Sequence, residues 1–260
     1  MKIRLLLLSL LSIAVAGEVS AQNAVSEARH DGFVGNVKEV TSNMYEAITE
    51  GDNIRLGDCL ERMQISYNAK GQRRSMVYLS IAEEDVIFRT RYKHDGFGQT
   101  TLEQVVDNDE HVIGRTYYIY DANFFLTETY VEDAERQVEC RTLYKYDAMG
   151  RVSQRSCNDP DNDVYKREVF TYNANGTINK TVVYDREKKK VQELRYEYDS
   201  HNQPVSLTRY DYTEAEPEVF ITLYRYRYDD HGNWIQKTEY SEDRGNATAE
   251  YVTERTLEYF

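Results

Sequence analysis

Aromatic and polar residues alternate along most of the chain, in short stretches separated by turn residues. In the clearest stretch, Tyr144 and Tyr146 share one face of an expected strand, because side chains alternate with period two. Asp147 can accept a hydrogen bond from the backbone two residues on, and Gly150 tolerates the left-handed conformation that closes a tight turn. Val152 then returns to the face of the two tyrosines. This pattern predicts a β-hairpin.

The same hairpin recurs at a spacing of 26 residues in most of the chain. Aligned on Tyr146, the equivalent positions, which we call the anchor positions, are Tyr67, His94, Tyr120, Tyr146, Tyr172, Tyr198 and Tyr228. The turn that follows each of them is the anchor turn. Four residues later each copy has Gly or Asn, which tolerate positive φ, except for Phe124, where we expect strain or a different turn. A second polar turn, marked by an aspartate, follows half a period later at Asp107, Asp133, Asp159, Asp185 and Asp211. Each unit is therefore expected to be two strands and two turns of an antiparallel meander with about 16 strands.

The run from Tyr146 to Val152 resembles the consensus of the YD-repeat (RHS repeat) family of exported bacterial proteins. In that consensus, tyrosine and aspartate are followed by two variable residues, glycine, arginine and an aliphatic residue. The resemblance covers roughly residues 58–260. It implies long antiparallel sheets that curl into spiral or hollow shells, and it implies carbohydrate binding.

We therefore expect an all-β fold, in which residues 34–260 form a long meander that curls or spirals as a single sheet. The face opposite the tyrosines is charged, for example at Arg89, Arg91 and Lys93, so the sheet should curl around its half-apolar tyrosine face. An outer-membrane barrel is the alternative suggested by the number of strands. Lipid-facing positions of such a barrel must be continuously apolar, whereas several strands here carry charges on both faces. On that ground we expect no membrane span.

The beginning of the chain has the pattern of a secretory signal peptide at residues 1–21. Lys2 and Arg4 form a positive start, an apolar core follows, and small residues up to Ala21 form a cleavage site. Residues 22–33 are polar and unpatterned, and we expect a flexible arm there. Export to the periplasm, the cell surface or the extracellular space follows from the signal peptide.

The charge of the chain argues against two classes of partner. The formal net charge is −13. An acidic surface repels the phosphates of nucleic acids and anionic lipid head groups, so we expect neither as a partner.

The aromatic positions of the repeat are the candidate binding residues, because flat rings stack on sugars and tyrosine adds a hydroxyl group. They are Tyr92, Tyr118, Tyr120, Tyr144, Tyr146, Phe170, Tyr172, Tyr196, Tyr198, Tyr226, Tyr228 and Trp234. They indicate a non-enzymatic protein that binds a glycan or a surface protein through an aromatic sheet face. The alternative is a structural or scaffold protein in which these rings form buried cross-strand ladders, and core packing is the expected role of Trp234. A hydrolase is a third possibility, and it requires converging carboxylates or histidines.

No motif indicates a metal, a cofactor or a catalytic centre. The acidic run 159–163 resembles the start of a calcium loop, but Val164 replaces the required glycine and Phe170 the required glutamate. A solvated turn is the better interpretation of this run. None of the histidines has metal-ligand spacing, and no nucleophile has a recognisable base.

Two of the three cysteines, Cys140 and Cys157, flank the hairpin at Asp147. If Tyr146 pairs with Val152, as the apolar pattern favours, strict alternation directs the two sulfur atoms to opposite faces. Pairing of Tyr146 with Arg151 would instead place them opposite each other and permit a disulfide. We expect the first register.

Overall fold

The computed structural model describes residues 26–51, 53–81 and 85–260. The expected signal peptide and the first residues of the expected arm lie outside these ranges. None of the described helices is long and apolar enough to cross a membrane.

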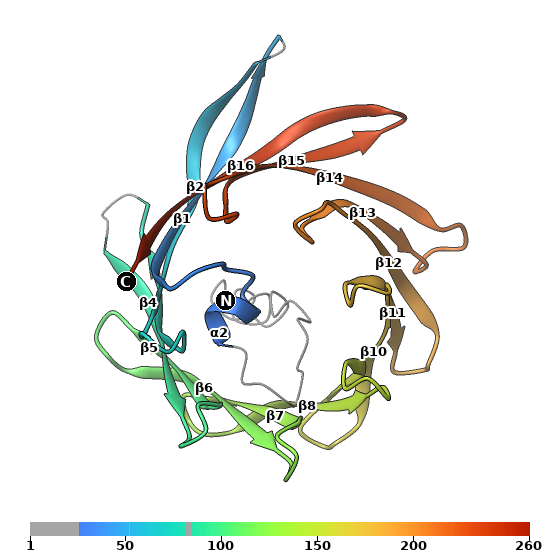
Figure 1. Ribbon diagram of the computed structural model, residues 1–260. Coiled ribbons are helices and arrows are strands. Elements are labelled where there is room, and N and C mark those ends of the chain that lie inside the picture. The colour runs from blue at the N-terminus through green and yellow to red at the C-terminus, as the bar shows by residue number, and fades with distance from the viewer. Residues whose placement is uncertain (1–25, 52, 82–84) are drawn as a thin grey trace.

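The strands form one closed antiparallel barrel in which each strand pairs with its neighbours in sequence, and β1 pairs with β16 (Figure 1). A short helix, α2 (Glu27–His30), precedes them. The strands are β1 (Val37–Glu50), β2 (Asn53–Tyr67), β3 (Arg73–Leu79), β4 (Val86–His94), β5 (Thr100–Asp107), β6 (Val112–Tyr120), β7 (Leu126–Asp133), β8 (Val138–Tyr146), β9 (Val152–Asn158), β10 (Val164–Tyr172), β11 (Ile178–Asp185), β12 (Lys190–Tyr198), β13 (Pro204–Asp211), β14 (Glu218–Tyr228), β15 (Trp234–Asp243) and β16 (Asn246–Tyr259). The all-β prediction is confirmed, but the prediction of an open, curled or spiral sheet is wrong.

Closure occurs where the first strand meets the last. Val40 pairs with Leu257 and Thr41 with Thr256 across this seam. Val37 and Val40 are only 1% and 2% exposed, and they pack with Phe33 in a small apolar cluster beneath the seam. The sheet therefore curls around its tyrosine face, as expected, but continues until its two edges meet. Closure satisfies the backbone groups that an edge strand leaves unpaired.

The anchor turns and most of the second turns share one geometry. In the hairpin between β8 and β9, the amide of Asp147 donates to the carbonyl of Arg151 (2.8 Å) and the amide of Gly150 to the carbonyl of Asp147 (3.1 Å). The residue at the position of Gly150 has positive φ, 79° here and 67° at Phe124. Phe124 thus keeps the common turn, in a backbone conformation that is unfavourable for a residue with a side chain.

Each anchor turn is followed by a register shift. In the hairpin of β8 and β9, Tyr146 pairs with Val152, but Lys145 pairs with Gln154, so Ser153 forms a β-bulge. A bulge adds one residue to one strand and reverses the side-chain alternation beyond it. This shift decides which residues of β9 face the lumen.

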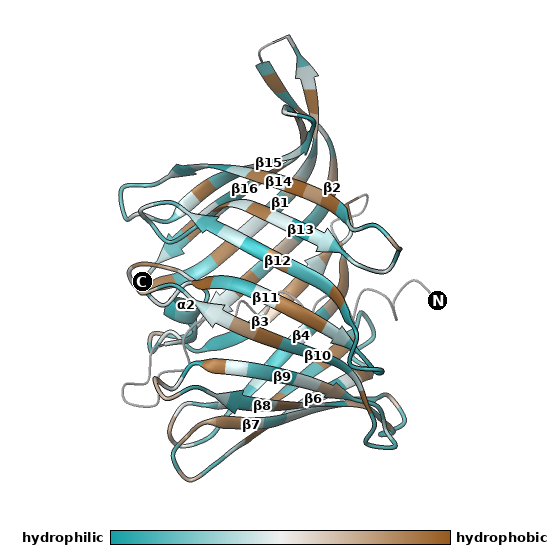
Figure 2. Ribbon diagram, turned by 90° about the vertical axis from the view of Figure 1, so that its right-hand side faces the viewer, coloured by the Kyte–Doolittle hydropathy of each residue, from teal (hydrophilic) through white to brown (hydrophobic). Residues whose placement is uncertain are grey.

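The outer wall carries the charged face of the sheet. Teal and brown segments alternate along the strands in Figure 2. Arg89 and Arg91 both reach Glu110, and Arg141 Nη1 lies 3.2 Å from Glu128 Oε1. Charges on both faces were expected to exclude an outer-membrane barrel, but the structure is a closed barrel, and these charges of its outer wall pair with one another.

Candidate binding site in the barrel lumen

The tyrosine face of the sheet lines the lumen. Helix α2 lies inside the ring of strands (Figure 1), and its side chains contact residues of this face. Glu27 lies 2.9 Å from the His94 ring nitrogen Nε2, and Tyr67 donates to Asp31 at 2.6 Å. Because directly paired residues of neighbouring strands lie on the same face, the pairing around the barrel places the other anchor positions on the lumen side as well.

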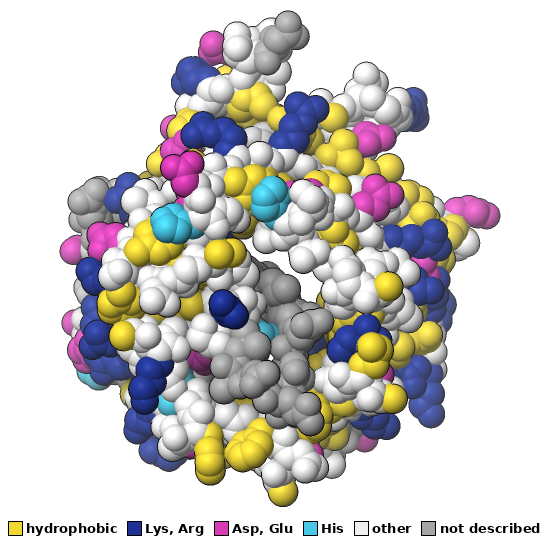
Figure 3. All heavy atoms as spheres, viewed as in Figure 1, with side chains coloured by type: hydrophobic (Ala, Val, Ile, Leu, Met, Phe, Trp, Pro, Cys, Tyr) yellow, Lys and Arg dark blue, Asp and Glu magenta, His cyan; other side chains and the backbone are white. Residues whose placement is uncertain are grey.

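All twelve candidate residues lie on this lumen face, as the strand register requires. They are Tyr92 in β4, Tyr118 and Tyr120 in β6, Tyr144 and Tyr146 in β8, Phe170 and Tyr172 in β10, Tyr196 and Tyr198 in β12, Tyr226 and Tyr228 in β14, and Trp234 in β15. The space-filling view along the barrel shows an opening inside the ring of strands (Figure 3).

Several of these tyrosines fasten neighbouring hairpins to each other. In three successive units the hydroxyl donates to a backbone carbonyl 20 residues earlier: Tyr120 to Thr100 (2.9 Å), Tyr146 to Leu126 (2.7 Å) and Tyr172 to Val152 (2.6 Å). Tyr226 makes a similar bond to the carbonyl of Pro204 (2.9 Å). These phenols satisfy backbone acceptors, so they have a structural role whatever else the lumen does.

The tyrosines two residues before the anchors meet polar side chains instead. The Tyr118 hydroxyl donates to Glu103 Oε1 at 2.6 Å, and the Tyr144 hydroxyl lies 3.5 Å from Thr129 Oγ1. The wall at these points therefore combines an aromatic ring with a side-chain oxygen. Sugar rings are recognised by this combination, since a flat face can stack and polar atoms can bond to hydroxyl groups.

Trp234 lies beside an arginine rather than in an apolar core. The Arg255 guanidinium carbon is 3.3 Å from the centre of a Trp234 ring and 5.3 Å from that of Phe33. Its Nε lies 3.3 Å from Ser42 Oγ. In the part of the chain that the structure describes, no carboxylate forms an ion pair with Arg255, so the two rings provide its main compensation. Arg255 was not among the residues predicted from the sequence. Its only sequence signal was its position on the lumen side of an alternating strand.

A second lumen cluster lies in β9 and β10. Glu168 accepts hydrogen bonds from Arg155 and forms an ion pair with Lys166 (2.9 Å). Glu168 is 6% exposed, so both cations compensate a buried carboxylate. These contacts join β9 and β10 through a buried ion pair.

Residues 26–36, which we call the plug, close part of the lumen. Arg73 forms an ion pair with Asp31, and Ala28 donates its amide to the carbonyl of Gly71 (2.9 Å). Asn233 Oδ1, on the opposite side of the seam, accepts from the amide of Val34 (2.7 Å). We expected a flexible arm over residues 22–33. The described part of this arm instead makes contacts with strands on both sides of the seam. Burial lowers the pKa of His30 from its usual range.

The two cysteines near the Asp147 hairpin lie on the same face. Tyr146 pairs with Val152, as the apolar pattern predicted, but the bulge places Cys157 opposite Thr142. Cys140, two residues before Thr142, therefore also faces the lumen, and the inference that the two sulfur atoms point to opposite faces is wrong. Both are free thiols in the structure.

The acidic turn at residues 159–163 is used for local structure. Asp159 Oδ1 accepts the amide of Asp163 (2.9 Å), and Asp159 Oδ2 lies 2.5 Å from Arg186 Nη2. Within the described ranges, no group of three or more His, Cys, Asp or Glu residues is arranged to hold a metal ion.

Comparison with known proteins gives a fold but no family. No protein-family model and no curated protein matches the chain. A solved structure from Bacteroides uniformis, described as a porin-like protein, is similar with a TM-score of 0.56 and 10% sequence identity, over 87% of this chain and 98% of that one. The expectation of no membrane span, which was based on the charges on both faces of several strands, is overturned by the closed sheet and by this similarity to a porin-like barrel. Barrels of this kind with 16–18 strands can enclose an aqueous channel.

Two other similarities are too weak to carry an argument. A chain of the Photorhabdus luminescens Tc holotoxin pore matches at 15% identity with a TM-score of 0.29, over 81% of this chain and 14% of that one. A protein of unknown function from Bacteroides fragilis matches with a TM-score of 0.23, 15% identity, and 45% and 86% coverage. The resemblance to YD repeats stays a prediction.

Proposed function

We propose that this chain is an exported, non-enzymatic barrel protein that binds a glycan or another cell-surface macromolecule on the aromatic wall of its lumen. One observation carries the proposal: Tyr118 and its neighbours present rings and side-chain oxygens together on an inward-facing wall. A polymer with ring-shaped polar units matches that wall better than an apolar ligand does.

Export is supported by the signal-peptide pattern of residues 1–21. A porin-like barrel is compatible with a place in the cell envelope or at the cell surface. The repeat itself supports a relationship to the YD-repeat family, whose members are suggested to bind carbohydrate.

A structural or scaffold role is the second candidate, and one observation favours it. The hydroxyl groups of Tyr120, Tyr146 and Tyr172 are already bonded to backbone carbonyls. On this reading the tyrosines hold successive hairpins in register and the lumen has no ligand.

A binding screen with two matched variants separates these functions. The mature protein is screened against soluble polysaccharides, and each hit is measured again with Tyr118→Ala and with Tyr117→Ala. Tyr117 is adjacent in β6 but stacks on Tyr130 across β7, with ring centres 4.6 Å apart, on the outer wall. We expect Tyr118→Ala to weaken binding about tenfold, as the loss of a stacking ring does, and Tyr117→Ala to leave it unchanged. Uniformly negative binding, or equal losses in both variants, would contradict the lumen site.

A further inference from the structure

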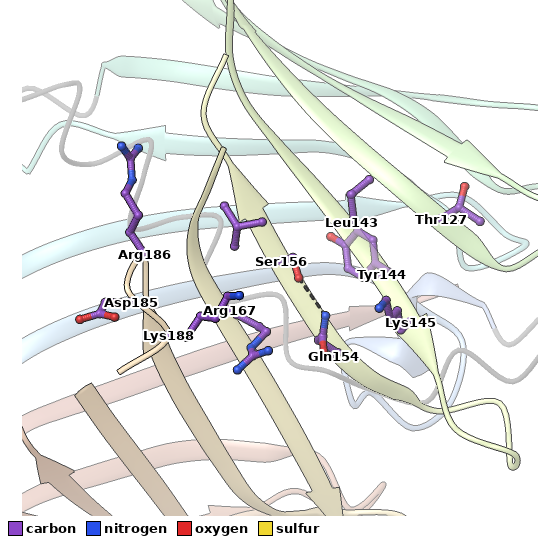
Figure 4. A pocket seen from close by; sticks show the side chains of 11 residues that line it. Thr127, Leu143, Tyr144, Lys145, Gln154, Ser156, Arg167, Asp185, Arg186 and Lys188 are labelled. Atoms are coloured by element: carbon purple, nitrogen blue, oxygen red, sulfur yellow. Dashed lines mark hydrogen bonds between the residues drawn. The ribbon is translucent and has the colours of Figure 1, made fainter. Parts of the chain in front are cut away.

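A groove of about 520 Å³ crosses the outer wall at β8, β9 and β10 (Figure 4). Leu143, Ser156 and Arg167 are direct neighbours across these three strands and form its floor. Lys145 lies toward one end, and Lys188 approaches from the turn between β11 and β12. Tyr144 also lines the groove, but Leu143, Ser156 and Arg167 belong to the face of the wall opposite the tyrosines, so the groove is distinct from the lumen site.

Three cations of this groove lack a carboxylate partner among the described residues: Lys145, Arg167 and Lys188. Two other arginines near this part of the wall are paired, Arg141 with Glu128 (3.2 Å) and Arg186 with Asp159 (2.5 Å). Three unpaired cations in one groove are unexpected in a chain with a net charge of −13. Together they produce a local positive potential that attracts anions.

Arg167 provides a second, independent observation. Its guanidinium lies over the Tyr184 ring, 4.5 Å from the centre. Its Nε is buried and has no hydrogen-bond partner among the residues that the structure describes. A buried donor without an acceptor is costly, and an anion that enters the groove offsets that cost. Asp185 provides the one carboxylate among the described residues that line the groove, and it already accepts the amide of Lys189 (2.8 Å) in its own turn.

The groove also has an apolar part. Leu143 is 40% exposed and Val164 is 41% exposed, and both contribute to its lining. An anion alone leaves these side chains in water. A ligand that joins an anionic group to a hydrocarbon chain satisfies both parts of the surface.

We propose that this groove binds the phosphate head group of a lipid. The phosphate oxygens accept hydrogen bonds from Arg167 and from the Lys145 and Lys188 ammonium groups, and an acyl chain covers Leu143 and Val164. The outer wall is the side of a barrel that meets its surroundings, which suits a lipid better than a ligand that must enter the lumen. A free phosphorylated sugar shares the phosphate but lacks the apolar part.

The test uses the full mature chain and four probes: a short-chain phosphatidic acid below its micelle concentration, the matching diacylglycerol, glycerol 3-phosphate and inorganic phosphate. We expect the phosphatidic acid to bind at least about tenfold more tightly than each of the others, because only it supplies both parts. Arg167→Gln is expected to weaken that binding about tenfold. Lys188→Gln, in an exposed turn, should weaken it several-fold and serves as the second variant if Arg167→Gln does not fold. Lys93→Gln, on the outer wall at β4, is the control and should have no effect.

Three results would overturn the lipid site. Equal binding of the diacylglycerol would show that the phosphate is not recognised. Binding of glycerol 3-phosphate as tight as that of the phosphatidic acid would assign the groove to a soluble phosphate ester. Unchanged binding in both Arg167→Gln and Lys188→Gln would place the lipid elsewhere on the barrel.

Discussion

The Tyr146 hydroxyl donates a hydrogen bond to the backbone carbonyl of Leu126, 2.7 Å away and 20 residues earlier in the chain. Leu126 is the first residue of β7, and its carbonyl lies next to the turn that precedes it. The bond therefore joins the beginning of one repeat to the end of the next. This bond explains why the repeat uses tyrosine at this position, since phenylalanine has the ring but no hydroxyl group to donate to the carbonyl.

Tyr146→Phe is expected to lower the free energy of unfolding by about 1–2 kcal/mol, because a partly buried carbonyl loses its partner. Tyr130→Phe is the matched control. Tyr130 stacks on Tyr117 on the outer wall, and its substitution should change stability by less than about 0.5 kcal/mol. Urea unfolding of both variants measures the difference. Equal effects would show that the bond to Leu126 is not needed.

The positive φ angles of the turns give a second prediction: two substitutions at such positions should change the free energy of unfolding in opposite directions. Lys188 is exposed and has a φ of 65°, so Lys188→Gly should raise the free energy of unfolding by about 1 kcal/mol. Gly232 has a φ of 85°, and an added Cβ there meets no atom within 4 Å.

Gly232→Ala should therefore lower stability by about 1 kcal/mol through backbone strain alone. Thermal unfolding of the two variants, compared with the wild type, gives both numbers. A loss of stability in Lys188→Gly would mean that its side chain makes contacts that outweigh the unfavourable φ.

The repeat allowed the strands, the turns and their common aromatic face to be predicted, because each of these depends on local spacing. Tyr146 and Asp147 show this best, since one residue fixes a face and the next fixes a turn. Closure could not be predicted in the same way. It depends on how the small twist at each strand pair accumulates around the sheet, and on whether Val40 finally meets Leu257.

The face assignments of β9 failed for a local reason. The bulge at Ser153 reverses the alternation of all later residues in that strand, and nothing in the sequence of this hairpin marks it. Cys157 was consequently assigned to the wrong face. In the candidate site the aromatic positions were found from the repeat, whereas Arg255 and the plug residue Asp31 were not, because their partners are distant in sequence.

The plug depends on the ion pair between Asp31 and Arg73, whose side chains are 15% and 26% exposed. Asp31→Asn leaves the Arg73 charge without a partner in a partly buried place, so we expect a loss of about 2 kcal/mol. Hydrogen exchange in residues 26–36 should accelerate as the plug loosens. Glu258→Gln is the control, because Lys38 and Glu258 are both more than half exposed and their pair contributes little. Unchanged exchange in Asp31→Asn would show that the plug is held by other contacts.

The account depends most on the pairing of β1 with β16, and a disulfide across that seam tests it directly. The three native cysteines are replaced by serine, and Thr41→Cys is combined with Thr256→Cys, which are direct partners on the outer wall. Paired residues of antiparallel strands have Cα atoms about 4.5–5.5 Å apart, within the range for a disulfide. Ser66→Cys with Ser75→Cys, partners in β2 and β3, is the positive control, and Thr41→Cys with Thr171→Cys is the negative control. The closed barrel predicts that mild oxidation links residues 41 and 256 as completely as the positive control; an open sheet would leave them reduced while the control pair forms its bond.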